Sequence, residues 1–458
     1  MKMIPDTIEN IYFLGIGGIG MSALARYFKV KGFRVAGYDR TLSPLTQKMQ
    51  SEEGFRINYR DEEEEIGTEF RCPETTLVVY TPAIPADIRQ LNFFKNRGFA
   101  LHKRAEVLGM ISRQGKAICV AGTHGKTTVS TMTAFLLHHS AIGCNAFLGG
   151  ISVNFGTNLL LNPESPYIVI EADEFDRSFL HLTPALAVIT SMDEDHLDIY
   201  QNKANLTEAF EEFAGKVVEG GLLFLKKGLS LVKSAVTGYY GVETEADCYA
   251  DCLRVENGCY AFDYHGRGVV IENLVCGIPG RLNVENATAA ITLALEAGVS
   301  PEEIRRALPE FRGVVRRFNV HVNDGKRIYI DDYAHHPREI EATLRSIREI
   351  WPERSLTVVF QPHLYTRTRD FYPGFAKSLS LADEVILLDI YPARELPLPG
   401  IDSELIRERL TVSGRILSKE ALMEYISCDF RQGILVTMGA GDIDRLVHSI
   451  KTQLLIGK

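Results

Sequence analysis

The segment Ala121–Thr128, with the sequence AGTHGKTT, has the residue types and spacing of a phosphate-binding loop. An apolar run precedes it, and a helical pattern follows it. A strand, a glycine loop and a helix in this order present backbone N–H groups and a helix N-terminus to a phosphate. We expect Lys126 to reach the phosphates of a nucleotide and the Thr127 hydroxyl to bind Mg²⁺. Val120 stands where a standard loop has glycine, which predicts a tighter loop. The predicted nucleotide-binding residues of this loop are Gly122, Thr123, His124, Gly125, Lys126, Thr127 and Thr128.

Two further apolar runs end in acidic segments, EADE at 171–174 and SMDEDH at 191–196. Carboxylates that follow a strand near a phosphate loop suit Mg²⁺, because this ion prefers hard oxygen ligands. Acids that only stabilise the N-terminus of a helix are the alternative. We predict Glu171 as a metal ligand. His196 stays open between a metal ligand and a structural histidine, since imidazole is an unusual partner for Mg²⁺.

A second glycine-rich segment, GIGGIG, follows an apolar run near the start of the chain. Gly15, Gly17 and Gly20 fit the pattern GxGxxG, and Asp39 lies at the distance expected of an acid that binds a ribose. The pattern indicates that a phosphate-bearing ligand lies at the helix N-terminus. It does not choose between a dinucleotide and another nucleotide diphosphate, and a purely structural glycine turn remains an alternative.

Two segments of the last third of the chain, 331–337 and 360–369, combine histidine, arginine and tyrosine after predicted strands. We expect both to reach the same edge of a parallel sheet, so that His335, His363 and Arg367 share one ligand. Such a group suits a carboxylate or a developing phosphate charge. Surface arginines and helix-capping residues are the alternative.

Strands, loops and helices alternate in three successive blocks of this 458-residue chain. This order predicts an α/β fold with parallel sheets and crossover helices. We expect three domains: a Rossmann-like N-terminal domain over residues 1–105, a central P-loop ATPase-like parallel sheet over 106–314, and a Rossmann-like C-terminal domain over 315–458.

The net charge of −9 gives no electrostatic reason to expect nucleic acid or an anionic membrane as a partner. No apolar stretch approaches the length of a membrane span, and the first ten residues lack the apolar segment of a signal peptide. We therefore expect a cytoplasmic protein with reduced thiols. Cys248, Cys252 and Cys259 lie close together in an alternating segment, and we interpret them as buried strand residues, with a zinc site as the alternative.

Seven segments together resemble the Mur ligases, and any one of them alone is modest support. They are GIGGIGMSALA at 15–25, GTHGKTT at 122–128, EADE at 171–174, DHLD at 195–198, NVENATAAI at 283–291, DDYAHHP at 331–337 and FQPHLYTRTRD at 360–370. Within the family the pattern looks most like the branch that adds L-alanine to UDP-N-acetylmuramate.

The resemblance implies a three-domain enzyme of peptidoglycan precursor synthesis that uses ATP and Mg²⁺. The lactyl carboxylate of UDP-N-acetylmuramate would be activated as an acyl phosphate, which the amine of L-alanine then attacks. The N-terminal domain would hold the UDP part, so the first glycine motif would not be an NAD site. The resemblance does not fix the oligomeric state, which stays open between monomer and homodimer.

The resemblance also implies roles for individual residues. Lys126 would stabilise the transferring phosphoryl group, while Thr127 and Glu171 would hold one Mg²⁺ and Glu171 with His196 a second. Asn286 would contact adenine. The residues expected at the UDP part are Gly15, Gly17, Gly18, Gly20 and Asp39. Those expected at the alanine and reacting-carboxylate end are Asp332, Tyr333, His335, His363 and Arg367, and those expected at the domain junction or a phosphate are Arg316 and Arg317.

One departure concerns Leu364, which stands where the family often has arginine, so that Arg367 must then supply the cation. Some relatives use a carbamylated lysine, but Glu211 falls at that distance here. Three alternatives compete: a ligase that attaches an intact tripeptide to the same sugar nucleotide, a dinucleotide-dependent dehydrogenase, and a nucleotide-gated scaffold without catalysis. The segment QPHLYTRT favours the L-alanine-adding branch over the tripeptide ligase, and Lys126, Thr127 and Glu171 have no purpose in a dehydrogenase.

Overall fold

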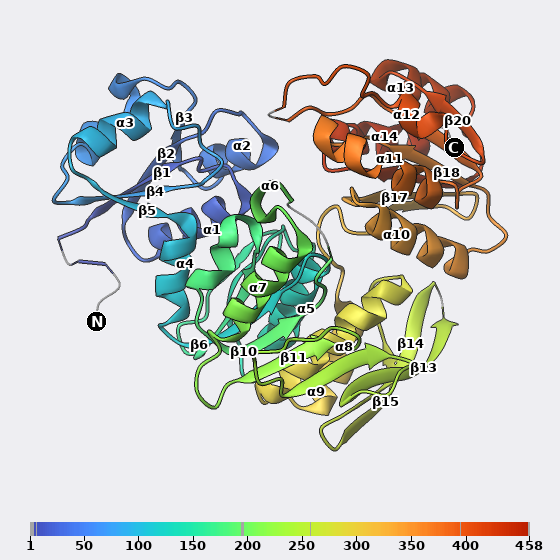
Figure 1. Ribbon diagram of the computed structural model, residues 1–458, viewed down its shortest axis with the longest axis horizontal. Coiled ribbons are helices and arrows are strands. Elements are labelled where there is room, and N and C mark those ends of the chain that lie inside the picture. The colour runs from blue at the N-terminus through green and yellow to red at the C-terminus, as the bar shows by residue number, and fades with distance from the viewer. Residues whose placement is uncertain (1–3, 6, 194–196, 257, 394, 457–458) are drawn as a thin grey trace. The chain divides into compact units, whose positions relative to one another are not determined.

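The computed structural model describes residues 4, 5, 7–193, 197–256, 258–393 and 395–456 (Figure 1). The chain divides into two compact units. The first comprises Met1–Asp251, Tyr264–Ile271 and Asn286–Ala307, and the second comprises Cys252–Asp263, Glu272–Glu285 and Leu308–Lys458.

The first sheet of unit 1 has five parallel strands in the order β3-β2-β1-β4-β5. Its strands are β1 (Asn10–Leu14), β2 (Arg34–Tyr38), β3 (Arg56–Asn58), β4 (Thr76–Tyr80) and β5 (Ala100–Lys103). The helices of this part are α1 (Ile19–Val30), α2 (Pro44–Ser51), η1 (Glu63–Glu65), η2 (Thr68–Phe70), α3 (Arg89–Asn96) and α4 (Arg104–Ser112). Every residue of β1 is buried, as expected for a central strand of a parallel sheet covered on both faces. The first glycine loop, which follows β1 directly, therefore lies at the carboxyl edge of this sheet.

The second sheet has ten strands in the order β15-β14-β13-β12-β11-β10-β6-β9-β7-β8. Its strands are β6 (Lys116–Ala121), β7 (Asn145–Phe147), β8 (Leu159–Leu160), β9 (Tyr167–Ala172), β10 (Pro184–Ile189), β11 (Leu222–Lys226), β12 (Gly238–Val242), β13 (Cys248–Glu256), β14 (Cys259–Gly266) and β15 (Val269–Val275). Strand β6 lies between β9 and β10 and is parallel to both, so the loops after these three strands meet at one edge.

The helices of residues 126–310 lie between or after the strands of the second sheet along the chain. They are α5 (Lys126–His138), η3 (Phe175–His181), α6 (Leu197–Tyr200), α7 (Lys203–Ala214), α8 (Arg281–Glu296), α9 (Pro301–Ala307) and η4 (Leu308–Glu310). The division between the two units passes through β13, β14, β15 and α8.

Unit 2 contains the third sheet, of six strands in the order β16-β17-β21-β18-β19-β20, with only β16 antiparallel to its neighbour. Its strands are β16 (Asn319–Asn323), β17 (Arg327–Asp332), β18 (Leu356–Phe360), β19 (Glu384–Leu387), β20 (Ser413–Ile416) and β21 (Gly433–Met438). Its helices are α10 (Pro337–Ile350), α11 (Tyr365–Leu379), α12 (Glu404–Arg407), α13 (Lys419–Cys428), η5 (Asp442–Leu446) and α14 (Val447–Ile456).

The α/β fold with parallel sheets is confirmed, and the apolar runs expected before the two glycine loops and before 360–369 form strands β1, β6 and β18. The predicted domain boundaries stay a prediction. Helix α4 covers 104–112, so a boundary at 105 falls inside a helix. The contacts of the chain place the first sheet and strands β6–β12 of the second sheet in one unit.

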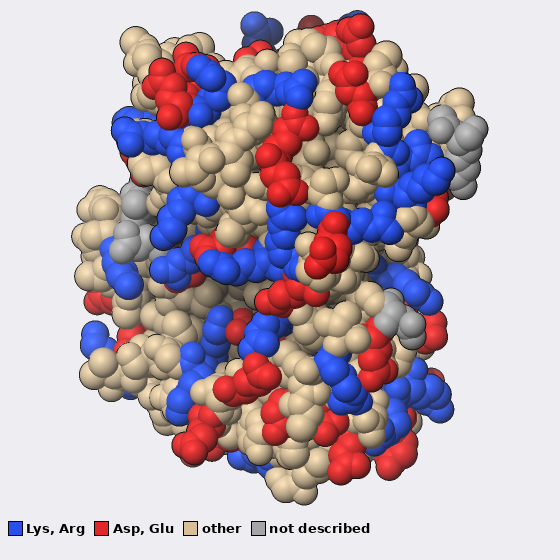
Figure 2. Space-filling view, turned by 90° about the vertical axis from the view of Figure 1, so that its right-hand side faces the viewer, with Lys and Arg blue, Asp and Glu red and all other residues tan. Residues whose placement is uncertain are grey.

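None of the described helices has both the length and the apolar character that crossing a membrane requires. On the face shown in Figure 2, basic and acidic side chains are intermixed.

The buried side chain of Asn158 joins helix α1 to the segment that precedes β8. Its amide group donates to the backbone oxygen of Ile19 at 2.6 Å and to the hydroxyl of Ser22 at 3.2 Å. Its oxygen accepts a hydrogen bond from Arg26 at 2.6 Å. These contacts connect the first two sheets of unit 1.

Asn158→Ala removes all three hydrogen bonds, so buried groups on α1 lose their partners. We expect the free energy of unfolding to fall by about 2 kcal/mol, measured from urea unfolding followed by far-UV circular dichroism. The control is Asn96→Ala, at an exposed position at the end of α3, which we expect to change stability by less than about 0.5 kcal/mol. Equal midpoints for the two variants would contradict this role of Asn158.

Candidate active site

The phosphate loop predicted at 121–128 connects β6 to α5. Gly125 is the N-cap of α5 with φ of +82°, in the left-handed region that favours glycine. Gly122 has φ of +129°, and a Cβ there would overlap the Thr190 hydroxyl. Both glycines are therefore required by the path of the backbone, which brings the N-terminus of α5 to the carboxyl edge of the sheet.

Hydrogen bonds attach this loop to the end of β10. The Ser191 hydroxyl accepts from the backbone N–H of His124 at 2.7 Å and lies 3.0 Å from the Thr123 hydroxyl. The Thr190 hydroxyl donates to the backbone oxygens of His124 and Ala121. The loop is thus held in shape by the neighbouring strand.

Lys126 forms a buried ion pair with Glu174. Its Nζ donates to Glu174 Oε2 at 2.7 Å, and the Glu174 side chain has no exposed surface. Burial alone lowers the pKa of Lys126, but the carboxylates of Glu174, Asp173 and Glu171 outweigh this effect and raise it above its ordinary value. The lysine is therefore a fixed positive charge at physiological pH.

Glu171 lies in β9 at the position paired with Val120 of β6, directly beside the phosphate loop. A Cβ at Gly149 would overlap its carboxylate, so only glycine at this position leaves room for the acid. Carboxylate and hydroxyl oxygens from Glu171, Asp173 and Thr127 are the hard donors that Mg²⁺ prefers, so this donor set fits the ion. The metal roles stay predictions, and His196 lies outside the described residues.

Two other predicted nucleotide residues lie at the same loop. The Asn286 side-chain oxygen is 3.0 Å from the position that a Cβ on Gly125 would take. Thr128 is buried in the first turn of α5. The predicted contact of Asn286 with adenine is not tested by these positions, but they place its amide beside the loop that would hold the nucleotide phosphates.

The first glycine loop has the geometry of a helix N-terminus open to a ligand. Gly15 has φ of +87°, and Gly18 is the N-cap of α1. Asp39 Oδ2 accepts from the Gly17 N–H at 2.8 Å, and Asp39 Oδ1 accepts from the Thr41 N–H at 2.9 Å. Asp39 therefore supports the loop in this structure, while its predicted ribose contact stays a prediction.

A cavity of about 260 Å³ joins this helix N-terminus to the acidic end of β9. It is lined by the start of α1 (18–21), by Thr81 and Pro82, and by 147–149. Glu171 and Asp173 complete its lining on the other side. Two motifs more than 150 residues apart in the sequence thus face one cavity within unit 1.

Sequence reasoning missed Arg104, which begins α4 and lines this cavity. Its guanidinium lies 3.6 Å from Asp173 Oδ2, and a Cβ on Gly20 would be 2.5 Å from Nη1. The sequence contains only a faint signal for it: a basic residue at the end of a block whose ligand would be anionic.

In unit 2, the rings of His335 and His363 approach to 6.5 Å between their centroids. The prediction that these two loops reach the same sheet edge is confirmed, because strand β21 alone separates β17 from β18. The Tyr391 ring stacks on His363 at 5.9 Å, a contact that sequence reasoning missed. Arg367 lies in the first turn of α11, whose N-cap is Leu364 with φ of +69°.

The predicted arginines gather around Tyr333. The guanidinium groups of Arg316 and Arg317 lie 5.4 and 4.9 Å from the centre of its ring. Arg316 donates to Asp331 Oδ2 at 3.2 Å and to the Gly439 oxygen at 2.8 Å. These contacts hold Arg316 beside β17 and beside the residue that follows β21. A contact of either arginine with phosphate stays a prediction.

Asp332 is the last residue of β17, whereas the sequence placed it in the loop after the strand. The strand extends through Asp332 because it continues to pair with β21. The carboxylate accepts from the N–H groups of Phe318 at 3.0 Å and Ala334 at 2.8 Å, and from the Thr343 hydroxyl at 3.2 Å. In this structure Asp332 therefore fixes the backbone around Tyr333.

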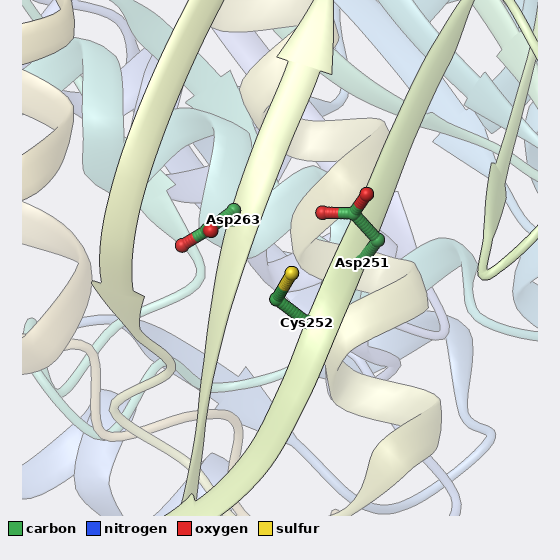
Figure 3. Close-up of side chains that lie close together, drawn as sticks. All are labelled: Asp251, Cys252 and Asp263. Carbon is green, nitrogen blue, oxygen red and sulfur yellow. The ribbon is translucent and has the colours of Figure 1, made fainter.

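The expected burial of the three clustered cysteines is confirmed for Cys248, is wrong for Cys252, which is exposed, and is only partly met by Cys259, which is half-buried. Its φ of +52° interrupts the alternation of β13 and turns the side chain outward. Figure 3 shows it with Asp251 and Asp263, whose ligand atoms lie within 4.8 Å of one another. Asp251 pairs with His265 at 3.0 Å, and Asp263 accepts a backbone N–H at 2.7 Å, so both carboxylates have partners within the protein.

Three family models match consecutive parts of the chain. Residues 10–116 match the Mur ligase family catalytic domain, 120–294 the Mur ligase middle domain, and 316–441 the Mur ligase glutamate ligase domain. A UDP-N-acetylmuramate–L-alanine ligase of Phocaeicola vulgatus is 51% identical over 453 residues, covering 98% of both chains. The chain belongs to the Mur ligase family. A protein of the same name from Porphyromonas gingivalis is 48% identical, covering 98% of this chain and 99% of that one.

Solved structures of Mur ligases agree with this membership. The UDP-N-acetylmuramate-alanine ligase of Thermotoga maritima has a TM-score of 0.83 and 27% identity, covering 98% of this chain and 100% of that one. A murein peptide ligase of Psychrobacter arcticus has a TM-score of 0.70 and 23% identity, covering 97% and 98%, and shows likeness of fold.

Gly149→Ala tests the placement of Glu171. The added methyl group would displace the Glu171 carboxylate, which is the movable end of a flexible side chain, so we expect the variant to fold. We expect kcat for ATP-dependent ligation to fall about 100-fold, because a shift of about 1 Å in a catalytic group has that effect. The control is Gly215→Ala at the end of α7, where an added Cβ meets nothing closer than 3.4 Å. A kcat equal to that of the control would contradict the role of Gly149.

Asp332→Asn tests the effect of burial on this acid. Burial raises the pKa of Asp332 to about 6, and Arg317 only partly opposes this. The unfolded chain releases the same proton near pH 4, so the folded state holds the proton more tightly between about pH 4 and 6. The contribution of Asp332 to stability is therefore present at low pH and is lost as pH rises through about 6, by about 2 to 3 kcal/mol in total.

The measurement is urea unfolding of both proteins from pH 4.5 to 7.5, followed by fluorescence of Trp351, the only tryptophan of the chain and part of unit 2. The wild type should lose stability relative to Asp332→Asn as pH rises. A difference between the two proteins that stays constant with pH would show that Asp332 does not titrate in this range.

Proposed function

We propose that this Mur ligase joins L-alanine to the lactyl carboxylate of UDP-N-acetylmuramate and cleaves ATP to ADP and phosphate. The observation that carries the proposal is the cavity of unit 1, which is lined both by the N-terminus of α1 and by Glu171 beside the phosphate loop. A nucleotide sugar on the first and ATP on the second would meet there. The names of the relatives, 44–51% identical over nearly the whole chain, support the choice of substrates.

The reaction needs activation because a carboxylate is a poor acyl donor at neutral pH. A lactyl carboxylate oxygen attacks the γ-phosphorus of ATP, the bond to the β-phosphate oxygen breaks, and ADP leaves. The amine of L-alanine then attacks the acyl carbon, phosphate leaves, and the amine loses a proton. Little covalent chemistry is left for the protein, so catalysis consists of positioning and charge neutralisation.

Lys126 supplies the fixed positive charge for the phosphoryl group in this scheme. The N–H groups of the Gly122–Thr128 loop and the N-terminus of α5 would bind the phosphates, with Asn286 toward the base. Glu174 holds the lysine ammonium at the loop through the 2.7 Å ion pair. The position of the positive charge is therefore fixed before a nucleotide binds.

Glu171 and Thr127 would hold Mg²⁺, with Asp173 near them as a further carboxylate. The ion, when bound, neutralises negative charge on the ATP phosphates. The role of these residues is to provide hard oxygen donors at the sheet edge, which the placement of Glu171 opposite Val120 supports.

The residues expected to bind L-alanine lie in unit 2. His335 and His363 lie at one sheet edge with Tyr391, and Arg367 begins the neighbouring helix. The carboxylate of the amino acid needs a cation to bind it. Mur ligases often have arginine at the position of Leu364, and in this chain Arg367 would take that role. ATP and a nucleotide sugar are cytoplasmic metabolites, so we place the reaction in the cytoplasm.

The decisive test is phosphate release by the full chain with ATP, Mg²⁺ and UDP-N-acetylmuramate. L-alanine, glycine, L-serine and the intact tripeptide are added in parallel. We expect the highest kcat/KM with L-alanine, and a loss of about 100- to 1,000-fold for Lys126→Ala because the phosphoryl group then lacks its fixed cation.

Turnover only with the tripeptide would assign the chain to the tripeptide ligases. No turnover with any of the four acceptors would support a nucleotide-gated scaffold instead.

A further inference from the structure

Arg104 lines the cavity of unit 1 and takes no part in the phosphoryl transfer described above. It is the only residue with a basic side chain among the described residues that line this cavity. Two acids, Glu171 and Asp173, line it as well. A doubly negative diphosphate entering such a cavity would be repelled unless a cation compensated for these carboxylates.

We propose that Arg104 binds the diphosphate of the nucleotide sugar and that Asp173 positions its guanidinium group for this contact. The inference rests on the proposed function, because it names a ligand group of that same substrate. Arg104 lies outside the glycine loops and the acidic segments of the site.

The guanidinium is placed over the first turn of α1. A Cβ on Gly20 would lie 2.5 Å from Nη1 and 3.1 Å from Cδ of Arg104, so the absence of a side chain at Gly20 is what admits it. Backbone N–H groups at the start of a helix point toward a bound anion, and the helix dipole adds about half a positive charge there. Arg104 therefore adds a full charge beside the partial one.

The contact with Asp173 orients the guanidinium group without a close hydrogen bond. The two groups lie 3.6 Å apart, which is longer than a normal hydrogen bond, and only 18% of the Arg104 side chain is exposed. Arginine presents a planar fork of N–H donors that matches two phosphate oxygens at once, which lysine does not. The fork would thus remain available to the ligand while its position is already defined.

The neighbouring residue, Lys103, provides a matched control. Its Nζ donates to Asp176 at 3.1 Å, its side chain is 39% exposed, and it does not line the cavity. Two adjacent cations, each paired with an acid of the segment after β9, thus differ in whether they face the ligand. Only Arg104 is expected to matter for binding.

The test is isothermal titration of the full-length wild type, Arg104→Gln, Arg104→Lys and Lys103→Gln. The ligands are UDP-N-acetylmuramate, UDP-N-acetylglucosamine, which keeps the diphosphate but lacks the lactyl carboxylate, and uridine, which lacks both. We expect Arg104→Gln to weaken both nucleotide sugars by the same factor, roughly 10- to 100-fold, as for a lost hydrogen bond to a charged group. The affinity of Arg104→Lys should lie between those of the wild type and Arg104→Gln, because lysine keeps the positive charge but lacks the planar fork of N–H donors.

Uridine affinity should not change in any variant, and Lys103→Gln should match the wild type with every ligand. Unchanged ATP affinity and far-UV circular dichroism show that the variants are folded. Arg104→Lys, which keeps the positive charge, serves if Arg104→Gln does not fold.

Three results would overturn the inference. Equal affinities of the wild type and both Arg104 variants would show that the guanidinium does not contact the ligand. Weaker binding of UDP-N-acetylmuramate alone would show that it contacts the lactyl carboxylate instead of the diphosphate. Failure of the wild type to bind either nucleotide sugar would remove the proposed function itself, whereas the first two results leave that function intact.

Discussion

The buried ion pair between Lys126 and Glu174 is the interaction on which the site in unit 1 depends. Removing a lysine ammonium from water is costly unless an anion compensates its charge, and breaking a buried pair leaves one uncompensated charge. The chain meets this requirement by placing β6 between β9 and β10, so that the loop after one strand and the acids after the next meet at one edge. Tyr200 completes the arrangement, since its hydroxyl donates to the backbone oxygen of Glu174 at 2.5 Å. The order of the strands therefore determines where the charge of Lys126 lies.

Local signals in the sequence predict much of the fold. The glycines of the two loops need left-handed backbone or close approach, and the apolar runs before them become buried parallel strands, so the strand–loop–helix units at 10–30 and 116–138 could be predicted without tertiary information. Pro337 likewise marks the start of α10, with His336 as its N-cap. These features depend on a few residues that are adjacent in the chain.

Features that depend on distant residues could not be predicted in this way. Arg104 gains its place from Gly20 and Asp173, and Gly149 is required only because the Glu171 carboxylate occupies the adjoining space. No spacing rule connects these positions. Cys252 was misplaced for a related reason: one residue with positive φ reverses the alternation on which the prediction of its face depended. The sequence therefore indicates which groups are present, and the packing decides what they touch.

Two of the positions that line the cavity of unit 1, Gly20 and Gly149, tolerate no side chain without moving a charged group. A substitution at Gly20 displaces the Arg104 guanidinium, and one at Gly149 displaces the Glu171 carboxylate. A small molecule that made its contacts to the backbone at these two glycines would thus bind a surface that the protein cannot easily alter. Mutations that blocked such an inhibitor by adding bulk there would disturb the enzyme at the same time, so resistance would have to arise elsewhere.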